Sequence, residues 1–369
     1  MENYYKPAHL KSKFSELYNK HEAHLMIAFF VGGFLFDLVT LSDPDDLFAI
    51  FQQVAYLTII GMILYYDVLN SFQKIQIPAK LTKIWEYRQL VVHFLFGSLL
   101  SLYSIFYFKS SSLLSSFVFI IIIGAILIAN EMSRVQSAGH WLKFGMFILC
   151  LNAFFSMLYP TILGFIGLIP FALAVLSTIG CAYFLFKKIL PRDIEKVFIQ
   201  KQLFMPMVVV QSAFILFYFA GWIPPVPLSA KYMGIYHNVE KKDGKYLLYH
   251  QKPIWKFWQN GDQAFEAQFG DNIYFFTNIY SPARFSDQVN IRWMHDDPIQ
   301  GWTTWDLIPM TISGGREDGF RGFTYKSKYQ PGDWRVQIET TDGREIGRIY
   351  FSVYTEEQSE QREFNIEER

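Results

Sequence analysis

Cysteine is almost absent from this chain of 369 residues, which has only Cys150 and Cys181. Both lie in long apolar runs, where a free cysteine packs as a small apolar residue. No cysteine follows Pro224. The second part of the chain therefore contains neither a disulfide framework nor a zinc site built on thiolates.

An excess of charge is also missing. The chain has 33 Lys and Arg against 33 Asp and Glu, and the stretch from Pro225 to Tyr354 is balanced as well. Proteins that bind nucleic acid present a basic face to the phosphates. The sequence therefore predicts no nucleic-acid partner.

Recognisable catalytic motifs are absent too. The sequence contains no H-E-x-x-H or G-x-S-x-G signature, and His237, His250 and His295 have no recognisable nucleophile beside them. The segment "HEAH", His21 to His24, fits the amphipathic start of a membrane helix better than a metal site. We predict no catalytic residue, no metal and no cofactor.

The chain is rich in long apolar runs, and 51% of its residues are hydrophobic. A helix needs about 20 apolar residues to cross a bilayer. Residues 1–24 are predicted to be a cytoplasmic segment, and residues 25–223 a transmembrane domain of seven helices. The seven predicted spans are Leu25 to Leu41, Leu47 to Leu69, Leu90 to Phe108, Ser112 to Ala129, Trp141 to Tyr159, Thr161 to Phe186, and Leu203 to Ile223.

The charges between these runs predict one orientation, because Lys and Arg are retained on the cytoplasmic side. The alternate connections on the other side carry only Lys109, and the first of them, "SDPDD", is acidic. An odd number of spans then places the residues after Ile223 outside. The predicted cytoplasmic cations are Lys6, Lys11, Lys13, Lys20, Lys74, Lys80, Lys83, Arg88, Arg134, Lys143, Lys187, Lys188, Arg192, Lys196 and Lys201.

Residues 224–354 have the alternation of β-strands. Asp243-Gly244 and Asp342-Gly343 each mark a hairpin turn, and "IYFFTNIY" and "VNIRWMH" lie between them. In the last hairpin Trp334 alternates with Arg335, so one face is buried. Seven or eight short strands predict an all-β, immunoglobulin-like antiparallel sandwich. Residues 355–369 are acidic and predict a mobile tail.

A glycine-rich stretch, "ISGGREDGFRGF" from Ile312 to Phe323, has the composition of a phosphate-binding loop. A nucleotide P-loop leads into a helix, whereas this stretch leads into the strand pattern "FTYKSKY", so we exclude a nucleotide site. Two hypotheses remain. The glycines Gly314, Gly315, Gly319 and Gly322 serve turns and bulges with positive φ. Alternatively, an anion or glycan site is formed by Arg316, Arg321 and Lys326 beside Trp302 and Trp305.

Polar residues within the apolar runs are costly, and each is a candidate functional residue. Asp37 lies near the outer end of the first span, where it fits a structural hydrogen bond or an ion-binding role. The set at the inner ends fits either interfacial positions, with Glu131 and Arg134 paired, or an intramembrane site. That set comprises Asp67, His93, Asn130, Glu131 and Arg134.

Several longer motifs resemble a known family. These are "FDLVTLSDPDD", "QQVAYL" and "NEMSR" in the apolar half, and "NGDQAFEAQFGD", "VNIRWMHDD", "GGREDGFRGFTYKSKYQPGDWRVQIET" and "REIGRIYF" in the other half. Over nearly its whole length the chain resembles uncharacterised bacterial membrane proteins that carry the domain of unknown function 2914. The resemblance implies a multi-span bundle followed by a small β domain, and it brings no reaction and no catalytic residues.

Three functions remain open. The first is a non-enzymatic protein of the cell envelope, anchored in the bacterial inner membrane, whose periplasmic β domain binds a protein partner or an anionic glycan. The second is an ion-coupled transporter component that uses Asp37 and the inner polar residues. The third is a membrane-embedded enzyme that acts on lipid-linked material near Asp37 and "SDPDD". The sequence favours the first, with the lipid bilayer as its surroundings.

Overall fold

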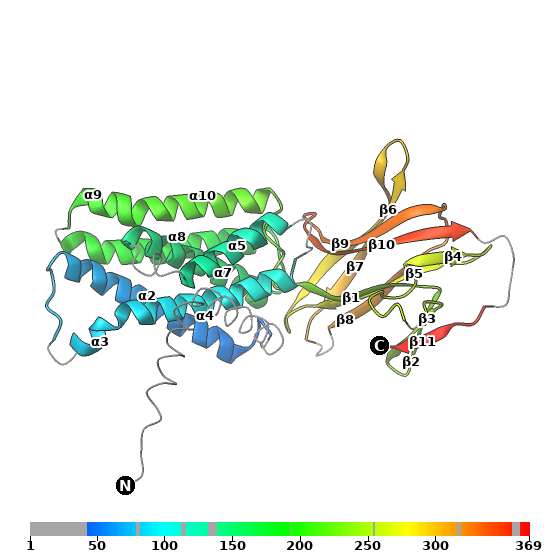
Figure 1. The fold of residues 1–369 in the computed structure, drawn as a ribbon, viewed down its shortest axis with the longest axis horizontal. Helices are drawn as coiled ribbons and strands as arrows, with labels where there is room; N and C mark the ends of the chain where they lie inside the picture. The colour runs from blue at the N-terminus through cyan, green and yellow to red at the C-terminus, as the bar shows by residue number, and fades with distance from the viewer. Residues whose placement is uncertain are drawn as a thin grey trace, which may run out of the picture.

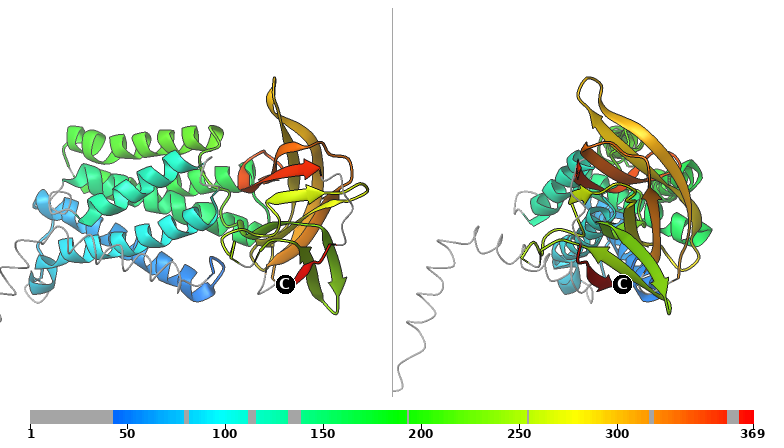
Figure 2. Two further views of the ribbon diagram at one scale, coloured as in Figure 1. Left: turned by 45° about the vertical axis from the view of Figure 1, so that its right-hand side comes forward. Right: turned by 90° about the vertical axis from the view of Figure 1, so that its right-hand side faces the viewer.

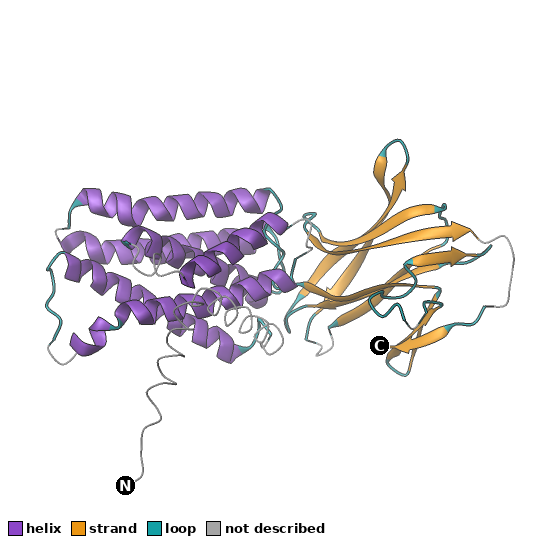
Figure 3. Cartoon of the chain, in the orientation of Figure 1, coloured by secondary structure: helices purple, strands orange, loops and turns teal. Residues whose placement is uncertain are grey.

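The computed structural model describes residues 43–78, 82–111, 116–131, 139–192, 194–253, 255–315, 319–355 and 362–369. A helical bundle and a β-rich part lie end to end, as Figures 1 and 3 show. The first predicted span, with Asp37, lies outside the described residues, as do Arg134, Arg316 and the side chains of Asn130 and Glu131.

The helical part is built from long apolar helices. The described helices are α2 (Leu47–Ser71), α3 (Thr82–Glu86), α4 (Arg88–Lys109), α5 (Phe117–Glu131), α7 (His140–Leu163), α8 (Leu168–Ile189), η1 (Leu190–Arg192), α9 (Lys196–Phe198), η2 (Ile199–Phe204) and α10 (Met205–Phe219). Within the described residues, five helical segments are long and apolar enough to cross a membrane, whereas the apolar part of α5, Phe117–Ile126, is shorter. A bundle of apolar helices is thereby confirmed, but a bundle of seven is not.

One predicted boundary between spans is wrong. The sequence predicts a new span from Thr161, but α7 continues through Pro160 to Leu163 and α8 begins at Leu168. The helix ends at Gly164, which has a φ of 80° and whose N–H donates to the Pro160 carbonyl at 2.9 Å. A left-handed residue closes a helix in this way, and glycine adopts that conformation at no steric cost.

Burial divides the helices into two groups. In their most apolar windows α4 and α7 are 61% and 56% buried, against 28% for α2, α8 and the helix that ends with α10. The less buried helices present exposed apolar side chains, among them Phe51, Leu176 and Leu216. An apolar face of this kind needs an apolar surrounding.

The described residues of the β part form three sheets. Its described strands are β1 (Ser229–Tyr236), β2 (Asn238–Lys242), β3 (Lys245–His250), β4 (Ala264–Ala267), β5 (Ile273–Tyr280), β6 (Ser286–Asp297), β7 (Gly301–Ser313), β8 (Phe320–Lys326), β9 (Gly332–Thr340), β10 (Glu345–Thr355) and β11 (Asn365–Glu368). The orders are β1-β5-β8, β4-β10-β9-β6-β7 and β11-β3-β2. All pairs are antiparallel except β4 with β10.

The main core of the β part lies between the first two sheets. Trp293 and Trp334 are fully buried there, and the Trp293 ring packs edge-on against Phe275 of the first sheet and Phe351 of the second. The predicted burial of Trp334 is therefore confirmed. Both predicted hairpins are confirmed as well, since β2 pairs with β3 and β9 with β10.

The predicted mobile tail is wrong for the last residues of the chain. Asn365–Glu368 forms β11, which pairs with β3, and Arg362 donates to both oxygens of Asp271 at 2.8 Å. Figure 2 shows this strand beside the β2–β3 hairpin. The acidic composition predicted a solvated segment, but strand pairing satisfies its backbone.

Hydrogen bonds join the two parts of the molecule. The Asp45 carboxylate, from "SDPDD", accepts from the Tyr280 hydroxyl at 2.8 Å and from the Ala283 N–H at 2.9 Å. Tyr218 in α10 donates to Asp342 at 3.3 Å. The acidic loop is thus tied to the β domain, and Asp46 caps α2 by accepting from the Phe48 N–H at 3.0 Å.

Candidate functional site

The structure brings together only part of the predicted anion site. The Lys326 Nζ lies 5.3 Å from the centre of the Trp305 ring and 5.7 Å from that of Trp334. Lys326 is buried and forms an ion pair with Asp306. Its charge is therefore balanced within the protein, and it serves the core more than an external ligand.

Arg321 lies on the other face of the same strand. Side chains alternate across a strand, and β8 directs Thr324 and Lys326 towards the main core, where Thr324 accepts from the Trp293 indole at 3.3 Å. The Arg321 guanidinium instead lies 5.8 Å from the Tyr246 ring of β3. Arg321 and Lys326 therefore do not converge, and Arg316 lies outside the described residues.

The glycines of this stretch serve two different needs. Gly315 and Gly319 have φ of 82° and 83°, as the turn hypothesis predicts. Gly314 and Gly322 do not have positive φ, so the turn hypothesis is wrong for these two glycines. A Cβ at Gly314 would lie 1.6 Å from the Pro282 carbonyl oxygen, so close packing requires glycine there.

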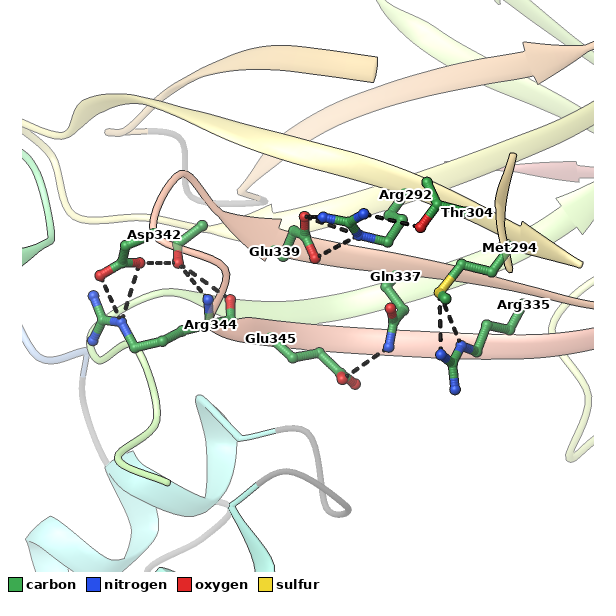
Figure 4. A network of polar contacts seen from close by, with 10 residues as sticks. Arg292, Met294, Thr304, Arg335, Gln337, Glu339, Asp342, Arg344 and Glu345 are labelled. Atoms are coloured by element: carbon green, nitrogen blue, oxygen red, sulfur yellow. Dashed lines mark hydrogen bonds and ion pairs between the residues drawn. The ribbon is translucent and has the colours of Figure 1, made fainter. Parts of the chain in front are cut away.

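Trp302 belongs to a different surface, the outer face of the five-stranded sheet. On this face Arg292 donates to both oxygens of Glu339, with a shortest distance of 2.6 Å, and to the Thr304 hydroxyl at 3.0 Å (Figure 4). Arg348 forms an ion pair with Glu345. We call this surface the Arg335 face, and it comprises Arg292, Met294, Trp302, Thr304, Arg335, Gln337, Glu339, Glu345, Arg348 and Tyr350.

Arg335 differs from the other two arginines of this face. Its guanidinium lies 4.6 Å from the centre of the Trp302 ring, and it donates to the Met294 sulfur at 3.1 and 3.3 Å. A thioether is a weak acceptor. Among the described residues, no carboxylate lies within ion-pair distance of Arg335. A guanidinium fixed against an aromatic ring without a counter-ion is suited to an incoming carboxylate or phosphate.

Tyr350 extends the site. The Tyr350 and Trp302 rings are 5.7 Å apart, edge to face, and Arg348 donates to the Tyr350 hydroxyl at 3.0 Å. Although partial burial opposes the effect, the guanidiniums of Arg348 and Arg335 lower the pKa of Tyr350. The face therefore offers two aromatic rings and a phenol, beside one guanidinium that has no carboxylate partner among the described residues.

Of the polar residues predicted at the inner ends of the spans, Asp67 is in an ion pair, and its partner is Arg88. Asp67 accepts from Arg88 at 2.6 Å and lies 3.4 Å from the His140 imidazole. His93 is buried. The Asp67 charge is thus balanced, while the predicted pair of Glu131 with Arg134 lies outside the described side chains.

A buried histidine and aspartate lie inside the β domain. The His237 Nε2 is 3.6 Å from an Asp262 oxygen, and the His237 ring stacks on Phe265 at 4.1 Å. Burial lowers the pKa of His237 to about 4 and raises that of Asp262 to about 6. The Phe364 ring of the tail covers His237. The described residues contain no group of three or more His, Cys, Asp or Glu suited to a metal.

Residues 286–353 match the family model described as a protein of unknown function, DUF2914. The chain carries a DUF2914 domain. The predicted resemblance is confirmed for this stretch, although it was predicted over nearly the whole chain. The DUF2914 match runs from the start of β6 into β10 and contains every residue of the Arg335 face. No curated protein matches the chain.

Solved structures resemble the DUF2914 chain only distantly. An immunoglobulin-like protein from Pseudomonas aeruginosa is 12% identical, with 32% of this chain and 96% of that chain covered and a TM-score of 0.19. A β-glucosidase from Listeria innocua is 10% identical over 31% and 16% of the two chains, with a TM-score of 0.18. A Pseudomonas fluorescens alkylpurine DNA glycosylase is 10% identical over 85% and 99%, with a TM-score of 0.20. TM-scores this low carry no argument about function.

Sequence reasoning missed Arg335 and Tyr350 as site residues. The signal was present, because the alternation in β9 and β10 assigns both to the face opposite Trp334. The sequence does not show which carboxylate pairs with each arginine on that face. Only the strand register, which sets Trp293 opposite Val336 and Met294 opposite Arg335, distinguishes Arg335 from the ion-paired Arg292.

Proposed function

We propose that the chain is a non-enzymatic, membrane-anchored binding protein of the bacterial cell envelope. Its apolar helices anchor it in the inner membrane as a seven-span bundle. Its β domain, an immunoglobulin-like sandwich in the periplasm, binds an anionic glycan on the Arg335 face. The observation that carries this proposal is the Arg335 guanidinium, held on the Trp302 ring without a carboxylate partner among the described residues.

A glycan fits this face better than a small free anion. The rings of Trp302 and Tyr350 offer apolar surface for the faces of sugar rings, while Arg335 offers paired N–H groups to an acidic substituent. The neighbouring Arg292 and Arg348 are balanced by Glu339 and Glu345 and hold the surface rigid. Preorganised donors of this kind lower the entropy lost on binding.

Binding is tested with polygalacturonate as the acidic polymer, dextran as the neutral one, and the full chain in detergent. We expect Arg335→Gln to weaken polygalacturonate binding by about 10- to 100-fold, as for a lost charge-assisted hydrogen bond. Binding by the unchanged protein should weaken as salt rises, because screening reduces charge attraction. Titration calorimetry at two salt concentrations measures both effects.

The matched control is Lys242→Gln, which removes one exposed positive charge from β2, in a different sheet. It should leave binding unchanged. Equal losses in the two variants would mean that net charge alone attracts the polymer. Binding of an acidic protein, but of neither polymer, would favour a protein partner instead of a glycan.

The proposed orientation predicts the outcome of reporter fusions. A reporter that is active only outside the cytoplasm should be active after Arg369 and inactive after Lys83. The fusion follows Arg369 because β11 pairs within the β domain and should be left intact. A reporter that is active only inside should give the opposite pattern. Similar activity at both positions would rule out an odd number of spans before the β domain.

A further inference from the structure

A groove of about 1290 Å³ runs along the helical part between α2, α7 and α8. Its floor is formed by α7 side chains that are mostly buried, Phe147, Leu151 and Phe154. Its walls are exposed side chains of α2 and α8, including Met62 and Phe184. Among the described residues nothing closes the groove, and it is lined mainly by apolar atoms.

The length of the groove identifies the kind of molecule that fits it. Along α2 its lining runs from Val54 to Tyr66, which is roughly 18 Å at about 1.5 Å for each residue. One leaflet contributes about half of the 30 Å hydrocarbon core of a bilayer. The groove is thus long enough to hold one lipid acyl chain.

One end of the groove is cationic. Lys188 and Arg192 line it where α8 passes into η1, and both side chains are exposed. The Lys188 Nζ lies 4.6 Å from the Phe184 ring, within the groove wall. Among the described residues, neither cation forms an ion pair. Tyr65 and Tyr66 of α2 line the same half of the groove.

We propose that this groove binds an anionic phospholipid of the cytoplasmic leaflet. Its phosphate lies between Lys188 and Arg192, and one acyl chain lies along the α7 floor. The inference rests on the proposed membrane topology, which places the end of α8 on the cytoplasmic side. Anionic lipids gather in that leaflet, and basic pockets between helices bind their headgroups.

Native mass spectrometry of the full chain in detergent tests the proposal, with phosphatidylglycerol and phosphatidylcholine of the same acyl chains as probes. The unchanged protein should retain phosphatidylglycerol in preference. The double variant Lys188→Gln, Arg192→Gln should lose at least about tenfold in phosphatidylglycerol affinity, because each cation contributes to phosphate binding. The control Lys187→Gln, which removes an exposed charge outside the groove lining, should retain the preference.

A second variant tests the apolar part of the groove. Gly180 lines the groove, and a Cβ added there meets no atom within 4 Å, so Gly180→Leu places an apolar side chain at the groove surface. It should reduce phosphatidylglycerol binding by filling the groove. Unchanged binding in this variant, equal retention of both lipids, or an equal loss in Lys187→Gln would overturn the proposal.

Membrane sedimentation after alkaline washing separates this inference from the proposed function. A chain that is released from the membranes contradicts the anchored protein itself. A chain that stays with the membranes but shows no preference for phosphatidylglycerol contradicts the lipid site alone.

Discussion

Trp334→Ala is expected to lower the free energy of unfolding of the β domain by about 3–5 kcal/mol, as for other large buried aromatic residues. The Trp334 side chain is fully buried, and its indole donates to the Gln330 carbonyl at 2.8 Å. Its ring also contacts Trp305 and His295. The substitution removes this packing and uncovers the buried Lys326 charge. Pulse proteolysis of the full chain in urea, with the bundle kept in detergent, measures the change.

Trp302→Ala is the matched control for Trp334→Ala. Trp302 lies on the outer face of the same sheet and is partly exposed. The loss should be clearly smaller than for Trp334→Ala, because the Trp302 ring is partly open to solvent and contacts side chains of the outer face instead of the core. Similar losses for the two tryptophans would mean that the core does not lie between the two sheets at this position.

Gly319→Val is expected to destabilise the β domain by about 3 kcal/mol or more, from backbone strain together with a clash. Gly319 has a φ of 83°, which a β-branched residue adopts only under strain. An added Cβ would also lie 2.4 Å from the Asn278 side-chain oxygen and 2.9 Å from the Ile279 carbonyl oxygen. Both contacts are on β5, the strand that pairs with β8. The urea midpoint in pulse proteolysis reports the loss.

Gly343→Val measures the cost of the backbone strain without the clash. Gly343 has the same φ of 83°, but a Cβ there meets no atom within 4 Å. Its cost should therefore be limited to the left-handed backbone, about 1–2 kcal/mol. If Gly319→Val prevents folding, Gly319→Ala provides the smaller step. Equal losses at the two positions would show that β5 and β8 yield to the added side chain.

The β hairpins show how far local patterns reach. Asp243 and Gly244 both have positive φ, and the flanking residues Lys242 and Lys245 pair directly. Turn chemistry and alternation are local properties, so the sequence predicted this hairpin correctly. The predicted count of seven or eight strands was too low. Among the strands it missed, β4 and β11 have only four residues each and depend on their neighbours for pairing.

The candidate site depended on distant contacts. The sequence grouped Arg321 with Lys326 because they are close along the chain, but an odd spacing on one strand directs them to opposite faces. Arg335 and Trp302 are far apart in sequence and meet only because β6 lies between β9 and β7. The order of the strands in the sheet cannot be read from a local sequence pattern.

The sequence by itself determined that apolar helices precede a β domain, that the break falls near Pro224, and where two hairpins turn. These features follow from hydrophobic periodicity and from turn residues, which act over a few positions. The tertiary structure alone decided which charges are balanced. It ties Asp45 to the β domain, buries Lys326 beside Asp306, and leaves Arg335 on Trp302 without a counter-ion among the described residues. The reason is that electrostatic balance depends on distance in space, and strand order and helix packing set those distances.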